Sequence, residues 1–170
     1  MRRSGDLADT PAPGLPGDVL RTALIAGAFA SVASTLALAG CGRREAGSGV
    51  APTNATSHWL WGRKALAARR PSWRHTVLGY VIHHGCATFW AVLHAWVHAE
   101  RRHTQSAGGA LASAAVTAAG ACAIDYTITP RRLTPGFEHH LSKGAVAIVY
   151  CCFALGLALG CAVADHGRHR

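Results

Sequence analysis

Four long apolar runs restrict what this sequence can fold into. They cover residues 22–41, 77–99, 104–124 and 144–164, and none of them contains Asp, Glu, Lys or Arg. A helix of about 20 mainly apolar residues crosses a hydrocarbon core about 30 Å thick, so each run is long enough to span a bilayer. Lipid offers the backbone no hydrogen-bond partners, which leaves helices as the structure for runs of this length. The sequence therefore predicts an all-α membrane protein built as a bundle of four transmembrane helices.

The composition favours a membrane protein over a soluble one. Of the 170 residues, 50% are hydrophobic and only 15% are charged, whereas a soluble domain carries about 25% charged residues. The net charge of +9 lies mostly between the apolar runs, above all in the first loop, residues 42–75. A basic loop beside a membrane helix favours a lipid bilayer with anionic headgroups as its partner, and we expect no binding to nucleic acid.

The runs divide the chain into three parts. Residues 1–18 hold three prolines, three glycines and mixed charges, and we expect them to form a disordered N-terminal tail. Residues 19–165 form the transmembrane domain, with helices at about 20–41, 76–99, 105–128 and 144–165, and residues 166–170 form a C-terminal tail. The third run is mostly alanine and glycine, so it would insert weakly alone. We therefore expect it to lie buried among the other helices.

The end of the first run raises an alternative. Leu38-Ala39-Gly40-Cys41 matches a lipoprotein cleavage box, so the run could be a signal peptide processed at Cys41. However, the run is longer than the apolar core of about 7 to 15 residues that signal peptides have, which favours a retained helix. All six cysteines lie in or beside apolar runs. We interpret them as small buried residues and not as a disulfide framework.

The loops carry their own structural signals. Residues 54–70 are expected to form a short interfacial helix in the first loop, with Asn54 or Thr56 as its N-cap. Trp59 and Trp61 suit the headgroup region, and the alternative is an irregular loop with its tryptophans packed on the bundle. Residues 129–138 contain two prolines and a glycine and predict a structured turn. The first and third loops hold ten of the 17 Lys and Arg residues, which favours the cytoplasmic side for both.

Ionisable residues in membrane helices are costly and therefore mark candidate sites. The link between the second and third runs is short, so these helices are expected to be antiparallel neighbours. With a rise of about 1.5 Å per residue, His83 and Asp125 then lie about 10 Å and about 5 Å inside the same membrane face. We expect Asp125 to pair with a histidine or with Arg131 or Arg132. The candidate residues of this polar face are His58, His75, His83, His84, Asp125, Tyr126, Arg131, Arg132 and Glu138.

The second run also raises the alternative of a metal site formed by His83, His84, His94 and His98. His94 and His98 stand one helical turn apart and could supply two nitrogens to one ion, but no carboxylate or cysteine is placed to complete a tetrahedral set. The spacing of His84 and His98 is close to that of ligands for two haems. Because the other runs contain no histidine, we do not expect two-haem binding. The cofactor is therefore unknown, with a metal ion open.

Small residues predict close packing between helices. Gly156 and Gly160 form a GxxxG pair, and Gly27, Ser31 and Ser34 give small positions in the first run. Small residues let membrane helices approach closely, so we interpret these positions as packing sites within the bundle. The alternative is contact with a second copy of the chain or with another membrane protein.

Several motifs form a recognisable set. They are Asn54-Ala55-Thr56-Ser57-His58-Trp59-Leu60-Trp61-Gly62, Arg74-His75-Thr76, His83-His84, Phe89-Trp90-Ala91, Asp125-Tyr126 and Pro130-Arg131-Arg132-Leu133-Thr134-Pro135-Gly136-Phe137-Glu138. Taken together, these motifs resemble a family of small, uncharacterised multi-pass inner-membrane proteins of proteobacteria. The likeness covers roughly residues 20–160 and implies a bacterial inner membrane, but it supplies no activity.

Three functional hypotheses remain at this point. No Walker loop, GxSxG, HExxH or GxGxxG motif occurs, which favours a non-enzymatic role. The first hypothesis is a membrane protein whose polar face, built around His83, His84 and Asp125, senses or conducts a proton or a small cation. The second is a membrane metalloprotein or enzyme, and the third is a structural partner of another membrane protein. The metal ligands in the second hypothesis are His58, His75, His83, His84 and Glu138.

Overall fold

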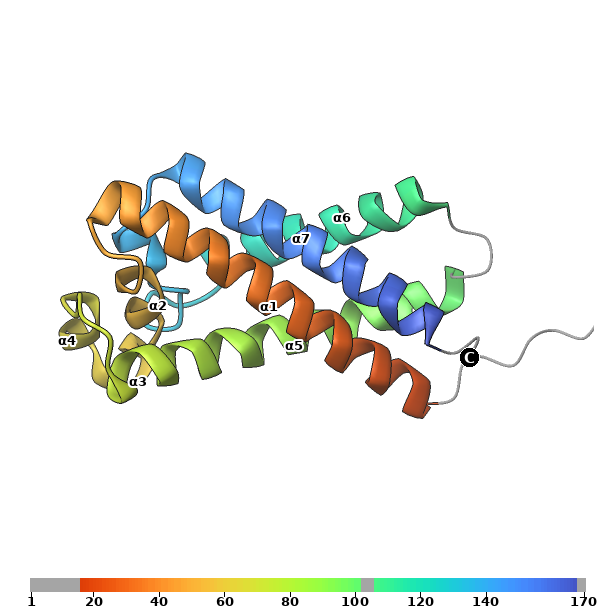
Figure 1. Cartoon of the computed structure of the whole chain (residues 1–170), viewed down its shortest axis with the longest axis horizontal. Coiled ribbons are helices and arrows are strands. Elements are labelled where there is room, and N and C mark those ends of the chain that lie inside the picture. Colours follow the sequence, from red (N-terminus) through yellow and green to blue (C-terminus); the bar gives the residue numbers. More distant parts are fainter. Residues whose placement is uncertain (1–15, 102–105, 168–170) are drawn as a thin grey trace, which may run out of the picture.

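The structure is a computed structural model that describes residues 16–101 and 106–167. Four long helices form its body: α1 (Pro16–Ala46), α5 (Leu78–Arg101), α6 (Ala107–Thr127) and α7 (Lys143–His166) (Figure 1). Each of the four is long and apolar enough to cross a membrane. Over the described residues, the predicted all-helical fold with four helices long and apolar enough to span a membrane is confirmed, and four such helices suggest a multi-pass membrane protein.

The interior of the bundle is made of small residues, while many large apolar side chains lie outside. A buried cluster that joins all four long helices consists of Ala26, Ala30, Ala87, Ala91, Ala114, Ala118, Phe153, Ala154, Leu157 and Cys161. Exposed positions on the same helices include Leu36, Val81, Val116 and Leu159, with Val116 exposing 73% of its surface. This arrangement suits lipid, because lipid tails are as apolar as leucine and helix association in lipid depends on close packing.

Helix α1 lies between α5 and α7 and packs against both (Figure 1). A Cβ added at Gly156 of α7 would stand 2.5 Å from the Cα of Ala30, and one at Gly160 would meet the Cα of Ala26. On the other side of α1, a Cβ at Gly27 would stand 2.9 Å from the Cα of Thr88 in α5. The predicted packing role of these glycines is confirmed, since both glycines of the GxxxG pair face α1 of the same chain.

Helix α6 corrects one expectation. It packs mainly on α7 and makes fewer contacts with α5, to which it is joined in sequence. Along its length Ala114, Ala118 and Ala121 are buried, while Leu111 and Val116 are exposed. The prediction that this run lies buried among the other helices is wrong. Small residues on one stripe are enough to hold α6 against α7, and outward alanines meet no penalty in lipid.

The ends of α1 also differ from expectation. The helix begins at Pro16, where proline is favoured because a first-turn N–H needs no partner, and it continues to Ala46 beyond the predicted end at residue 41. Arg43 and Arg44 occupy its last turn, where positive charge complements the helix dipole. Cys41 lies half-buried within this uninterrupted helix. The predicted disordered tail falls mainly on residues 1–15, and most of the C-terminal tail on residues 168–170, outside the described residues.

The first loop folds as a cap of short helices, not as one interfacial helix. The cap contains α2 (Ala51–Thr56), α3 (His58–Trp61) and α4 (Arg63–Leu66), followed by the π-helical turn η1 (Trp73–Val77) that leads into α5. Asn54 is fully buried in α2, so the prediction that Asn54 or Thr56 caps a helix is wrong. Its Nδ2 donates to the carbonyls of Ala68 and Arg70, at 3.0 and 3.1 Å, and its Oδ1 accepts from Thr76 at 2.7 Å. Asn54 therefore holds the cap to the start of the second span.

The third loop closes over the same end of the bundle, as a structured turn that ends in the 3₁₀ helix η2 (Phe137–His139). Gly136 has φ of +88°, and a Cβ there would stand 2.7 Å from the carbonyl oxygen of Ala55 in the cap. The indole of Trp59 donates to the carbonyl of Thr134 at 2.9 Å. Both loops therefore pack together on one end of the bundle, and the start of α1 and the end of α7 lie at the other end (Figure 1).

Candidate functional site

A cavity of about 390 Å³ lies at the loop end of the bundle. Helices α5, α6 and α7 form most of its sides, and α1 contributes Ser34. The two loops contribute Thr56, Trp59, Thr129, Leu133, Pro135 and Phe137. Its surface is mostly apolar, with six aromatic residues: Trp59, Phe89, Trp90, Phe137, Tyr150 and Phe153. Pockets for small molecules fall between about 300 and 1,000 Å³ and combine apolar walls with a few polar groups. This cavity has the size and the lining of such a pocket.

Asp125 supplies the carboxylate in the cavity wall. The hydroxyl of Tyr150 on α7 donates a hydrogen bond of 2.6 Å to its Oδ2. The rings of Tyr126 and Phe137 flank the Tyr150 ring, each with centroids 6.4 Å away. The expectation that Asp125 pairs with a histidine or an arginine is wrong, because its carboxylate accepts from this tyrosine instead. Nothing in the described ranges 16–101 and 106–167 places a cation in an ion pair with Asp125.

Of the two adjacent histidines of α5, His83 lines the cavity and His84 does not. His83 borders the cavity and shares a hydrogen bond of 2.8 Å with the hydroxyl of Ser34 on α1. His84 shares one of 2.8 Å with Ser31, and its ring lies 5.8 Å from that of Tyr80. The two serines, predicted as packing positions, therefore bind both histidines to α1. His83 and Asp125, which the sequence placed at the same membrane face, both line the cavity.

The remaining polar candidates are spread over the two loops. His58 is buried in the cap and its Nδ1 lies 2.8 Å from the carbonyl of Ala55. The Nδ1 of His75 lies 3.2 Å from the hydroxyl of Ser57. The side chains of Arg131 and Arg132 are exposed. These four residues therefore do not line the cavity.

Glu138, in η2 of the third loop, is a second carboxylate near Asp125. Its Oε2 is buried and has no hydrogen-bond partner within the described part of the chain, and its charge acts on both Asp125 and Tyr126. The neighbouring His140 is partly buried, and this burial lowers the pKa of its imidazole below the ordinary value. The loop end of the bundle thus holds two carboxylates near the cavity.

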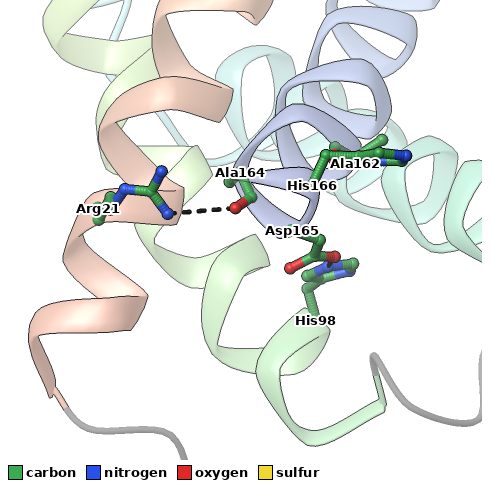
Figure 2. A network of polar contacts seen from close by, with 6 residues as sticks. All are labelled: Arg21, His98, Ala162, Ala164, Asp165 and His166. Atoms are coloured by element: carbon green, nitrogen blue, oxygen red, sulfur yellow. Dashed lines mark hydrogen bonds and ion pairs between the residues drawn. The ribbon is translucent and has the colours of Figure 1, made fainter. Parts of the chain in front are cut away.

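A second polar cluster lies at the opposite end of the membrane helices. His94 shares a hydrogen bond of 2.9 Å with Thr117, and His98 forms an ion pair of 2.8 Å with Asp165 on α7. Figure 2 shows this end, where Arg21 of α1 donates to the carbonyl of Ala164 at 3.2 Å. These contacts join α1, α5, α6 and α7. His94 and His98 therefore have a structural role, because each links α5 to a neighbouring helix.

The four histidines of α5 do not form one site. His84 and His94 are ten residues apart, which is about 15 Å along a helix. Across residues 16–101 and 106–167, no group of three or more His, Cys, Asp or Glu side chains is placed to hold a metal ion. The proposed ligand set of His83, His84, His94 and His98 is therefore split between the two ends of the bundle.

Comparisons of the chain with protein-family models, with curated proteins and with solved structures found no match. The resemblance to a proteobacterial membrane family stays a prediction. The site must be interpreted from its own geometry.

Sequence reasoning missed two residues that organise these clusters. Tyr150 is the only tyrosine in the fourth apolar run, and an isolated hydroxyl in such a run was the available signal for a polar partner. Asp165 follows the end of that run directly, where a carboxylate at the membrane boundary also needs a partner. In both cases the partner lies on another helix, so the sequence alone did not reveal it.

Proposed function

We propose that the chain is a bacterial inner-membrane protein that exchanges a proton and a small cation at Asp125, on the wall of the loop-end cavity. The observation that carries this proposal is a carboxylate within a membrane helix that borders a cavity and receives a tyrosine hydrogen bond, with no ion pair to any residue in 16–101 and 106–167. A bare carboxylate in apolar surroundings is costly, and a bound proton or cation offsets that cost. His83 of α5 gives the cavity wall a second titratable side chain, hydrogen-bonded to Ser34 of α1.

The location of the site in the membrane supports the inner-membrane assignment. Both basic loops pack on one end of the bundle, which suits the anionic cytoplasmic leaflet and the excess of Lys and Arg in cytoplasmic loops. The cavity then lies near the cytoplasmic face, where protons and cations can reach it from the loop side. Asp165 lies at the other end and pairs with His98, so it serves as a reference carboxylate in the same chain.

Chemical labelling of Asp125 tests the proposal. Dicyclohexylcarbodiimide reacts with protonated carboxylic acids in apolar surroundings and leaves a stable adduct that peptide mass spectrometry can locate. We expect labelling of Asp125 in the purified chain, falling as the pH rises because the reaction needs the protonated acid. Asp165 should label less, because the Nε2 of His98 lies 2.8 Å from its Oδ2 and occupies the reactive carboxyl group. The matched variants are Asp125→Asn, which removes the reactive group, and Asp165→Asn.

Several titratable groups near Asp125 affect how its labelling by the carbodiimide depends on pH. They come from all the elements that surround the carboxylate: His83 and Cys86 of α5, Cys122 and Tyr126 of α6, Tyr150 of α7, and Glu138 of η2. A Glu138→Gln variant distinguishes the effect of Glu138 on labelling from that of Asp125, because it removes the charge of Glu138 and leaves the cavity residues in place. Absence of labelling at Asp125 at every pH, while exposed carboxyl groups are modified, would contradict the proposal.

A further inference from the structure

The cavity contains more than a carboxylate, and its walls restrict which cation fits. A small hydrated metal ion needs a shell of oxygen ligands, whereas this cavity offers mostly apolar surface around Asp125. No group of three potential metal-ligating side chains occurs in the described ranges. An inorganic cation would therefore have to keep most of its water in a space whose surface is mostly apolar.

An organic ammonium ion fits the same walls without that cost. Aromatic faces attract cations, and alkylated ammonium groups are recognised by cages of aromatic rings. Trp59, Trp90 and Tyr150 line the cavity from three different elements, α3, α5 and α7, so aromatic side chains contribute to several parts of the wall that also contains Asp125. The volume of about 390 Å³ accommodates an ammonium group with an attached apolar body.

The charge near the cavity also favours a cation. Asp125 has no ion-pair partner within residues 16–101 and 106–167, and the buried Oε2 of Glu138 has no hydrogen-bond partner there. The two carboxylates interact electrostatically. The nearby Arg131 and Arg132 are exposed on the third loop and do not line the cavity. A positive ligand would therefore relieve the repulsion between two like charges.

We propose that the loop-end cavity binds an organic ammonium ion with an apolar body, with its nitrogen at Asp125 and its body against the rings of Trp59, Trp90 and Tyr150. This inference rests on the proposed function, because it names the class of cation that replaces the proton on Asp125. Tyr150 forms part of the cavity wall. It is also a positioning residue for Asp125, since its hydroxyl fixes the carboxylate through a 2.6 Å hydrogen bond.

Binding of a matched pair of probes tests the inference. Benzyltrimethylammonium carries the required charge and ring, and neopentylbenzene has the same shape with carbon in place of the charged nitrogen. Equilibrium dialysis of the radiolabelled cation against the full chain in phosphatidylglycerol nanodiscs should show saturable binding at one site. Asp125→Asn should weaken this binding by about tenfold or more. Trp90→Leu, which keeps an apolar wall, should weaken it several-fold.

Asp165→Asn is the control variant, since it makes the same chemical change at the opposite end of the bundle and should leave the affinity within about twofold. Circular dichroism melting of each variant reports whether the bundle still folds. Equal affinity for the cation and for neopentylbenzene, or unchanged cation affinity in Asp125→Asn, would overturn the inference. Phosphatidylglycerol has no ammonium group, so adding phosphatidylethanolamine distinguishes the sources: weaker probe binding assigns the site to a lipid ammonium, and unchanged binding assigns it to a soluble amine.

Carbodiimide labelling separates this inference from the proposed function. If benzyltrimethylammonium protects Asp125 from labelling and potassium at equal concentration does not, both proposals hold. If both cations protect equally, Asp125 exchanges cations but the cavity does not select organic ones, and the inference fails alone. If Asp125 is never labelled although benzyltrimethylammonium binds, the proton exchange fails and the ammonium site remains.

Discussion

Replacing Gly156 by alanine should separate α1 from α7 and destabilise the bundle. The added methyl carbon would lie 2.5 Å from the Cα of Ala30 and 2.7 Å from the carbonyl oxygen of Phe29. Carbon atoms in contact normally stand about 3.5 to 4.0 Å apart, so the two helices must move apart by roughly 1 Å. Backbone atoms cannot move aside as a flexible side chain would, and overpacking of this kind costs about 1 to 3 kcal/mol.

The matched control is Gly120→Ala in α6, where an added Cβ meets nothing within 4 Å. Both variants gain the higher helix propensity of alanine, which is about 1 kcal/mol. The difference in free energy of unfolding between them therefore isolates the overpacking at about 1 to 3 kcal/mol. The assay is unfolding in mixed micelles by titration with sodium dodecyl sulfate, followed by far-ultraviolet circular dichroism.

Equal stabilisation of both variants would show that Gly156 does not face α1 at the distance described, and the reasoning would fail. A variant that keeps its stability but loses self-association would instead mean that the GxxxG pair joins two copies of the chain. Gly160→Ala should behave like Gly156→Ala, because its added Cβ meets the Cα of Ala26 on the same helix.

Three further predictions concern the loops. Asn54→Ala removes three hydrogen bonds from a fully buried side chain, so unfolding should become easier by roughly 2 to 4 kcal/mol, measured by the same titration. Trp59→Phe removes the bond to Thr134 and should cost about 0.5 to 1.5 kcal/mol, with faster amide hydrogen exchange in the third loop. Burial lowers the pKa of His140 in the folded chain, so the unfolded chain binds a proton first as the pH falls. Stability present above about pH 6.5 should therefore decline below it, and His140→Gln should flatten this decline in a titration series at several pH values.

The four helices were predictable because crossing a bilayer is a property of each run by itself. About 20 apolar residues without charge are sufficient, whatever the rest of the chain does. The end of α1 was less predictable. Gly42, Arg43 and Arg44 look like the start of a charged loop, yet the helix continues through them. Long arginine side chains can reach the headgroup region from the last turn of a helix, so charge alone does not mark where a membrane helix ends.

The candidate site was predictable only in part. Helix rise and antiparallel pairing put His83 and Asp125 at one membrane face, and both line the cavity. The partner of Asp125 depends on the register between α6 and α7, which are joined by a loop long enough to allow several arrangements. Tyr150 therefore could not be chosen from the sequence. The histidines also have serine partners on α1, and hydroxyl groups in an apolar run indicate packing and hydrogen bonding equally well.

The alanine-rich interior has a consequence for how the molecule moves. Seven of the ten residues in the buried cluster are alanines, which have no side-chain rotamers, so repacking there is confined to Phe153, Leu157 and Cys161. A change in spacing therefore depends mainly on shifts of whole helices against one another. A change at the loop end that altered the spacing of these helices would therefore displace them as whole units, with little local repacking in this cluster to absorb it.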